Sequence, residues 1–257
     1  MSGEREPLLE GTLISHLLEL RTRLMRAFLA VILVFIPFAF YSNRLFEWLS
    51  QPLRRALPAN STLISTSITA PFTTPLKLAF VAALVLAMPY VLYQLWAFVA
   101  PGLYRHEKRY AVPLLLSSIV LFYTGTAFAY FAVLPLIFTF FVSTTPHGVQ
   151  MMADITMYMD FVLKLLFSFG VAFEVPVAVV LLVLMGMVPL SKLTQIRGYV
   201  LIAVFVIAAV ITPPDAVSQT IMAVPMYLLY EGGILMARLM TRGRGKTGPQ
   251  AQPEGNE

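Results

Sequence analysis

Apolar stretches of 14 to 30 residues recur along this chain, and short polar segments separate them. A helix needs about 20 mostly apolar residues to cross a bilayer. Hydrophobic residues make up 58% of the 257 residues and charged residues only 12%. A water-soluble domain cannot bury that much apolar surface. The sequence therefore predicts an all-α integral membrane protein in which residues 1–240 form one membrane domain.

Six transmembrane helices are expected, both from the lengths of the apolar runs and from the polar breaks between them. Residues 241–257 are rich in glycine, proline and charge, and we expect this tail to be disordered. No short apolar region with a small-residue cleavage site is visible near the start, so the first span is expected to act as its own insertion signal. The expected spans cover about 24–41, 76–99, 113–142, 161–188, 199–212 and 218–237.

Two interfacial helices are expected outside the spans. Residues 12–24 place leucines on one helical face and charged residues on the other, which predicts an amphipathic helix lying on the membrane surface. The second helix surrounds Trp48, whose ring suits the headgroup level, and we expect Pro52 and Pro58 to break it.

The distribution of basic residues predicts the orientation. Of the 18 Lys and Arg, 13 lie in the two terminal segments and in the loops expected on the same side, around residues 100–110 and 189–197. The long first loop on the other side holds three. Because cytoplasmic loops carry the excess of Lys and Arg, both termini are predicted to be cytoplasmic. The same pattern explains the net charge of +5 without nucleic acid as a partner.

Prolines within the spans predict kinked helices and a concave bundle, because proline removes a backbone hydrogen bond. Spans 5 and 6 are expected to be short. Span 5 offers about 21 Å of helix against about 30 Å of hydrocarbon. Two explanations stay open: the pair is packed inside the bundle, or the bilayer thins beside it.

Glu174 is the most unusual residue, because a carboxylate inside a span costs at least a few kcal/mol. No Lys or Arg lies at matching depth in any expected span. Lys164 is about 15 Å away along the helix and is predicted to pair with Asp160 instead. Glu174 would then need water, a neutral donor, another chain or a proton. A proton-coupled secondary transporter using Glu174 is therefore one functional hypothesis.

Enzyme and metal signatures are absent from the sequence. There is no cysteine, and no H-E-x-x-H, G-x-S-x-G or Walker motif. His16, His106 and His147 are scattered between the two expected sides of the membrane, so a metal cluster is not expected. The sequence thus predicts neither an enzyme nor a cofactor.

Four motifs stand in order along the chain: S-H-L-L-E-L-R-T-R-L at 15–24, A-P-G-L-Y-R-H-E-K-R at 100–109, F-E-V-P at 173–176 and T-P-P-D at 212–215. In these motifs, and from about residue 7 to 238, the chain resembles the TatC family of twin-arginine translocase receptors. The resemblance implies a receptor in the inner membrane for signal peptides with two consecutive arginines. It also implies export of folded proteins with the partners TatA and TatB in a multi-copy complex, driven by the proton-motive force.

The resemblance also assigns roles to residues. It implies that Glu19 and Glu107 contact the arginine pair, beside Arg21 and the loop aromatic Phe98. Glu174 corresponds to the intramembrane acid. Further family positions are Thr212 and Gln219 for partner docking, and Pro52 and Asp215.

From the residues alone, each assignment has a simpler alternative. Glu19 can form an ordinary surface ion pair with Arg23, Glu107 can be a solvated loop charge, and Asp215 can cap the sixth span. The small residues just before Thr212, Ala208 to Val210, depart from the family pattern and put the partner packing there in question.

Overall fold

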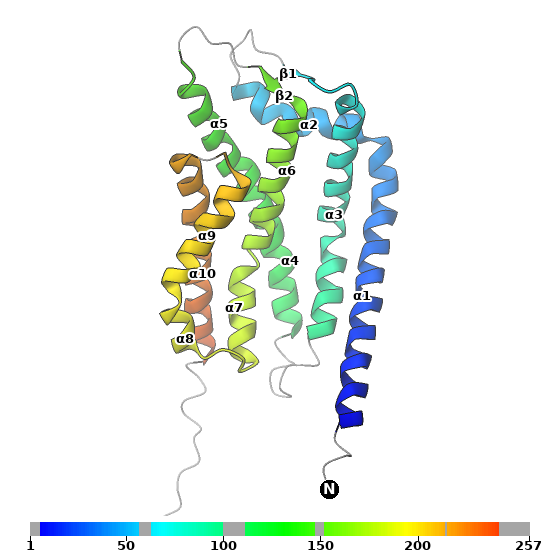
Figure 1. Cartoon of the computed structure of the whole chain (residues 1–257), viewed down its shortest axis with the longest axis vertical. Coiled ribbons are helices and arrows are strands. Elements are labelled where there is room, and N and C mark those ends of the chain that lie inside the picture. Colours follow the sequence, from blue (N-terminus) through cyan, green and yellow to red (C-terminus); the bar gives the residue numbers. More distant parts are fainter. Residues whose placement is uncertain (1–5, 57–62, 100–110, 147–151, 214, 242–257) are drawn as a thin grey trace, which may run out of the picture.

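The computed structural model describes residues 6–56, 63–99, 111–146, 152–213 and 215–241 (Figure 1). Within these ranges nearly every residue is helical, and the only sheet is a two-residue parallel pairing of β1 (Leu63–Ile64) with β2 (Ala153–Asp154). The long helices run roughly side by side. We call the end where α1 begins the amino-terminal end and the opposite end, where α2 and the two strands lie, the α2 end.

The first helix, α1 (Glu6–Phe40), is continuous over 35 residues, or about 52 Å. The prediction of a separate surface helix over 12–24 is therefore wrong. No proline or glycine interrupts the chain between residues 12 and 36, so nothing breaks the helix where the polar face gives way to the apolar run. The polar segment prolongs the span in the same direction (Figure 1).

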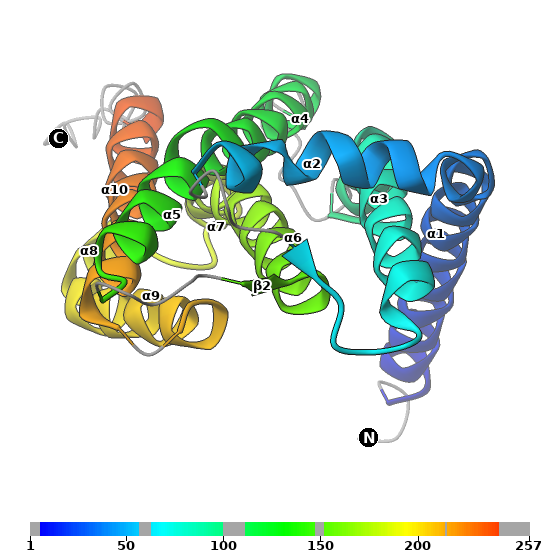
Figure 2. The ribbon, with the colours of Figure 1, turned by 90° about the horizontal axis from the view of Figure 1, so that it is seen from above.

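Helix α2 (Ser42–Ala56) crosses the α2 end of the bundle (Figure 2). It was expected to break at Pro52, but it continues to Ala56. Trp48 is 56% exposed and its ring stacks on Tyr130 at 5.3 Å between centroids, as suits an interfacial position. Tyr158 donates a hydrogen bond to the Leu49 carbonyl and ties α2 to the bundle.

Among the residues that the structure describes, five helical segments are long and apolar enough to cross a membrane. The third is interrupted by a π-helical stretch and the fourth is divided near Glu174, so kinks occur as expected. The six-residue α8 occupies the segment that was expected to be a turn. The segments are α1; α3 (Ala70–Val99); α4 (Ala111–Phe128) with η3 (Ala129–Val133) and α5 (Leu134–Ser143); α6 (Ile155–Ala172) with α7 (Val175–Leu184); and α10 (Ala216–Thr241). The shorter helices α8 (Leu190–Gln195) and α9 (Arg197–Ile211) lie between α7 and α10.

Of the two spans that were expected to be short, only one is short. Helix α9 has 15 residues, or about 22 Å, so the fifth apolar segment is short as expected. Helix α10 has 26 residues and is long enough to cross, so the prediction of a short sixth span is wrong. The predicted span of 218–237 left out Ala216 and Val217 at one end and the polar end from Arg238 to Thr241 at the other, although these residues continue the helix.

The bundle is centred on α6, which packs against α4 at two glycines. A β-carbon on Gly125 would lie 2.5 Å from the Phe169 carbonyl oxygen, and one on Gly170 would lie 2.6 Å from the Phe122 ring. Phe122 and Phe169 are almost fully buried. Hollows lie on both sides of Phe167, one against α1 and α3 and one against α9 and α10, which agrees with the expected concave bundle.

Candidate functional site

The start of α1 lies beside the end of α3 because the two helices pack antiparallel. His16 stacks on Phe98 at 4.2 Å near the amino-terminal end, while Phe35 meets Phe80 at 5.8 Å toward the other end. Buried small residues line the helix faces between these contacts, and they allow the backbones to approach. These residues are Ala27 and Val31 on α1, and Ala79, Ala83 and Ala87 on α3.

Glu19 lies one turn beyond His16 on the same face of α1, so it is close to the His16–Phe98 stack. It is half-buried, and its Oε1 accepts hydrogen bonds from Arg23 Nη2 at 2.6 Å and Arg23 Nε at 2.9 Å. This confirms the ion pair that was expected as the simpler explanation for Glu19. The pair leaves the local charge close to neutral.

Arg21 lies on a different face of α1, since residues two apart in a helix do not face each other. It is exposed and lines a shallow hollow of about 500 Å³ with Leu18, Met25 and Leu29. The structure therefore brings Glu19 and Phe98 to one corner but does not bring Arg21 to it. Glu107 lies outside the described residues, so its convergence with Glu19 stays a prediction.

Glu174 lies at the junction of α6 and α7, where it precedes the first residue of α7. Its Oε1 is buried and has no hydrogen-bond partner in the described part of the chain. It lines a pocket of about 130 Å³ together with Trp96 and Val99 of α3 and Ser118 of α4. Trp96 Nε1 donates to the Ser118 hydroxyl at 3.3 Å.

The last turn of α3 therefore links the two acids. Phe98 contacts the face of α1 that carries Glu19, while Trp96 and Val99 line the pocket of Glu174. Glu174 thus lies beside the last turns of α3, in the amino-terminal half of the bundle. Sequence alone gave no sign of this relationship, because the contacts join four helices that are distant in the chain.

The turn between α9 and α10 carries the residues expected to dock partners. Thr212 is buried and its hydroxyl bonds back to the Ala208 carbonyl, while Gln219 is half-buried on α10. Asp215 Oδ1 accepts the Ser218 backbone N–H at 2.6 Å, which confirms that Asp215 caps this helix. Asp215 Oδ2 and the buried Ser218 hydroxyl have no hydrogen-bond partner among the described residues.

Two charged groups have partners that the sequence did not suggest. Asp160 accepts Lys77 of α3 at 3.1 Å rather than Lys164, so that predicted pair is wrong. The packing of α3 against α6 brings the Lys77 ammonium to the Asp160 carboxylate, and this contact between helices replaces the predicted contact within α6. Glu231 of α10 accepts Arg197 of α9 at 2.7 Å and the Tyr227 hydroxyl at 3.1 Å.

The sequence also gave no prediction for Asp154, which bonds groups from two segments. Its Oδ1 accepts the backbone N–H groups of Thr156 and Met157 and so caps α6, while its Oδ2 accepts the N–H and hydroxyl of Thr66. Hydrogen bonds from Thr66 lower the pKa of Asp154 to about 2. Asp154 directly precedes the helix that begins at Ile155, and an aspartate at that position is a sequence signal for an N-cap.

Metal ligands do not cluster in the described part of the chain, where no group of three or more His, Cys, Asp and Glu side chains could hold an ion. The fold, with its apolar helices and two acidic positions near one end, defines a multi-pass helical membrane protein. The model of the family described as "Sec-independent protein translocase protein (TatC)" matches residues 15–225. The chain therefore belongs to the TatC family of protein translocase subunits.

Relatives and solved structures agree with this assignment. The TatC proteins of Azotobacter chroococcum and Escherichia coli K12 are 52% and 49% identical over 90% and 91% of this chain, and the matches cover 91% and 90% of theirs. A crystal structure of a twin arginine translocase receptor, TatC, superposes with a TM-score of 0.81 at 39% identity. It covers 88% of this chain and 100% of that one. The solute-transporter hypothesis for Glu174 finds no support among them.

Proposed function

We propose that this chain is the translocase subunit that receives signal peptides with two consecutive arginines, and that the α1–α3 corner with the following loop is the receiving surface. Glu19 and Glu107 would each take one guanidinium. The observation that supports this most directly is the position of Glu19. Its half-buried carboxylate already bonds a guanidinium through two nitrogens, beside an aromatic stack.

The chemistry of the corner favours arginine over lysine. A guanidinium is planar and offers paired donors to a carboxylate, whereas an ammonium is a point charge. Guanidinium also stacks on aromatic rings, and His16, which lies one turn before Glu19 on α1, already stacks on Phe98 of α3. Three basic residues of the following loop, Arg105, Lys108 and Arg109, would repel a loosely held cation. Binding would thus depend on directional hydrogen bonds to the guanidinium groups and would be selective for arginine.

We further propose that the protein lies in the inner membrane with both termini in the cytoplasm, and that α9 completes six spans. The excess of basic residues on the amino-terminal side supports this orientation. At about 22 Å, α9 is shorter than the hydrocarbon layer of about 30 Å. A covering partner or a locally thinned bilayer would resolve that mismatch.

TatA and TatB are the proposed partners, in an assembly with several copies of each chain. Thr212 and Gln219 would contribute to docking at the α9–α10 turn, where the unpaired Asp215 Oδ2 and Ser218 hydroxyl could bond a polar group of a partner helix. Glu174, with its unpaired oxygen, would meet a polar group of signal or partner. Pro52 is proposed to act at the α2 end. The energy source would be the proton-motive force, and the subunit itself would carry out no catalysis.

The test is binding of a fluorescent twin-arginine signal peptide to the purified full chain in nanodiscs. The variants Glu19→Gln, Glu107→Gln and their double are compared with Glu47→Gln, which removes an exposed carboxylate at the α2 end. We expect each single variant to weaken binding at least tenfold and the control to leave it unchanged. Binding of the double variant at wild-type strength would contradict the proposal.

A twin-lysine peptide serves as the second probe. Wild-type protein should bind it more weakly than the arginine peptide, and the glutamine variants should lose most of that preference. Equal binding of the two peptides by wild-type protein would show that charge alone governs the contact.

A further inference from the structure

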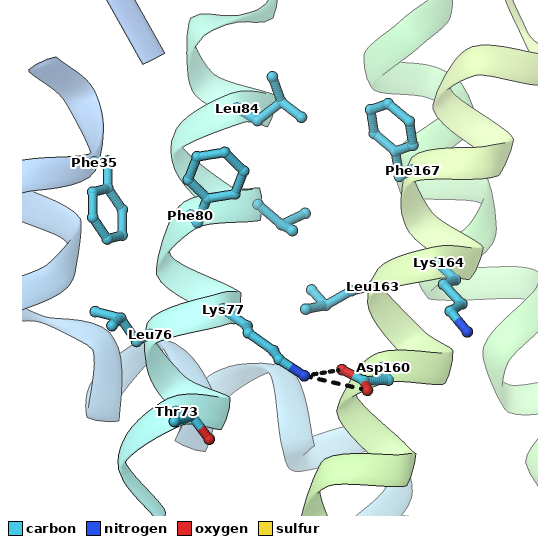
Figure 3. Close-up of a pocket in the computed structure, with 11 residues that line it drawn as sticks. Phe35, Thr73, Leu76, Lys77, Phe80, Leu84, Asp160, Leu163, Lys164 and Phe167 are labelled. Carbon is cyan, nitrogen blue, oxygen red and sulfur yellow. Dashed lines mark hydrogen bonds and ion pairs between the residues drawn. The ribbon is translucent and has the colours of Figure 1, made fainter. Parts of the chain in front are cut away.

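A large groove on the concave face, nearer the α2 end, belongs to none of the sites above. It has a volume of about 800 Å³ and lies between α1, α3 and α6 (Figure 3). Aromatic and aliphatic side chains form most of its wall, and two lysines and one aspartate lie along it. The lining residues include Phe35, Phe80, Leu84, Leu163 and Phe167, with Lys77, Asp160 and Lys164 as the charged members.

The groove has the length of one lipid leaflet. It extends along α3 from Thr73 to Leu84, which is about 16 Å of helix. Half of the hydrocarbon core is about 15 Å. The charged residues lie toward the Thr73 end and the apolar residues Leu84 and Phe167 lie deeper (Figure 3). This order of headgroup-level charge and deeper apolar wall matches a phospholipid with its phosphate toward the α2 end.

The charge of the groove favours an anion. Lys77 Nζ and Asp160 Oδ1 are 3.1 Å apart and compensate each other. Lys164 lies one helical turn from Asp160, is exposed, and has no ion-pair partner among the residues the structure describes. The three side chains together carry one net positive charge. A phosphate would find Lys164 available on α6, and Lys77 of α3, which is bonded to Asp160, would be a second donor.

A peptide helix fits the groove less well. A cationic signal segment would meet Lys164, which has no ion-pair partner among the described residues. The lysines of the groove instead complement the phosphate of an anionic lipid.

We propose that the groove binds one anionic phospholipid from the leaflet at the α2 end, with its phosphate at Lys164 and Lys77 and an acyl chain between α1, α3 and α6. The bound lipid would fill the groove on the concave face that faces the bilayer. It would do so without any movement of α1, which packs mainly on α3. Exposed Phe80 and Phe167 would cover the chain from the two sides.

The test measures retention of phosphatidylglycerol and of phosphatidylcholine with the same acyl chains, by native mass spectrometry of the full chain released from mixed nanodiscs. Wild-type protein should retain phosphatidylglycerol preferentially. Lys164→Gln should lower that preference about fivefold, the change expected for one lysine near the lipid surface. Lys192→Gln in α8, at the other end of the bundle, removes the same charge and should change nothing.

Charge rearrangement in the groove makes the test sharper. Lys77→Gln leaves Asp160 uncompensated and brings the net charge to zero, so the preference should fall. Adding Asp160→Asn to Lys77→Gln returns the net charge to one, so the preference should recover although two side chains have changed. Recovery in the double variant also shows that the protein is folded.

Three outcomes would overturn the proposal. One is equal retention of the two lipids by wild-type protein, and another is an equal effect of Lys164→Gln and Lys192→Gln. The third is displacement of phosphatidylglycerol by a twin-arginine peptide that crosslinks from a photoreactive residue at position 80, since the groove would then be a peptide site. None of these results depends on whether Glu19 and Glu107 bind the peptide.

Discussion

Arg23 donates two hydrogen bonds to a single oxygen of Glu19, at 2.6 and 2.9 Å. The carboxylate proposed to receive an arginine from a signal peptide is therefore already bound to an arginine of its own helix. An incoming guanidinium would have to displace Arg23 or share Glu19 with it. Competition from Arg23 would then prevent cations that bind only weakly from occupying Glu19.

Arg23→Gln is accordingly expected to strengthen binding of a twin-arginine peptide. An exposed i, i+4 pair contributes up to about 1 kcal/mol, so the dissociation constant should fall by twofold to fivefold. The comparison is Arg26→Gln, which removes the same charge from the same helix at a residue that forms no ion pair within the described part of the chain. Fluorescence anisotropy in nanodiscs measures both. Weaker binding by Arg23→Gln would mean that Arg23 helps to hold the peptide.

Gly233 of α10 is expected to tolerate no side chain. A β-carbon there would lie 2.8 Å from the Pro176 α-carbon and 3.1 Å from Val179 of α7, and backbone cannot move aside as a side chain can. Gly233→Ala should therefore destabilise the protein by about 1–3 kcal/mol. Denaturant unfolding in detergent micelles measures the change. Gly232→Ala is the matched control, because nothing lies within 4 Å of its β-carbon, and unfolding should be unaffected or slightly harder.

Asp154 is expected to make the α2 end sensitive to acid. Its pKa is about 2 in the folded protein and about 3.9 in an unfolded chain, so the folded state favours the carboxylate. The stabilisation is fully present above about pH 4 and is lost as the pH falls toward 2. Asp154→Asn should lower the melting temperature near pH 6, with the difference from wild type shrinking toward pH 2. A difference that stays constant over this range would contradict the assignment.

The sequence was sufficient to predict the membrane class, the shortness of the fifth apolar helix and the kinks, because each depends on local composition. Length of apolar run decides whether a helix can cross, and proline decides where it bends. The predicted ends were less accurate. The surface helix over 12–24 merged with α1, and α10 proved longer than expected, because helices continue through polar residues that leave the hydrocarbon.

Pairing between helices could not be predicted in the same way. The sequence favoured Lys164 for Asp160 because the two are four residues apart, whereas α3 supplies Lys77 from 83 residues away. The link from Glu19 through the last turn of α3 to Glu174 likewise depends on how the helices pack. The motifs therefore pointed to Glu19 and Glu174 as candidate site residues, while the relative placement of these two required the structure.

Arg197 and Glu231 provide the last prediction, since their ion pair joins α9 to α10. Both side chains are partly exposed, which limits the pair to about 0.5–1 kcal/mol. A double-mutant cycle with Arg197→Gln and Glu231→Gln, followed by denaturant unfolding in micelles, should yield a coupling energy of that size. Tyr227→Phe removes only the second donor to Glu231 and should leave the coupling in place. Strictly additive effects of the two substitutions would show that α9 is held by apolar packing alone.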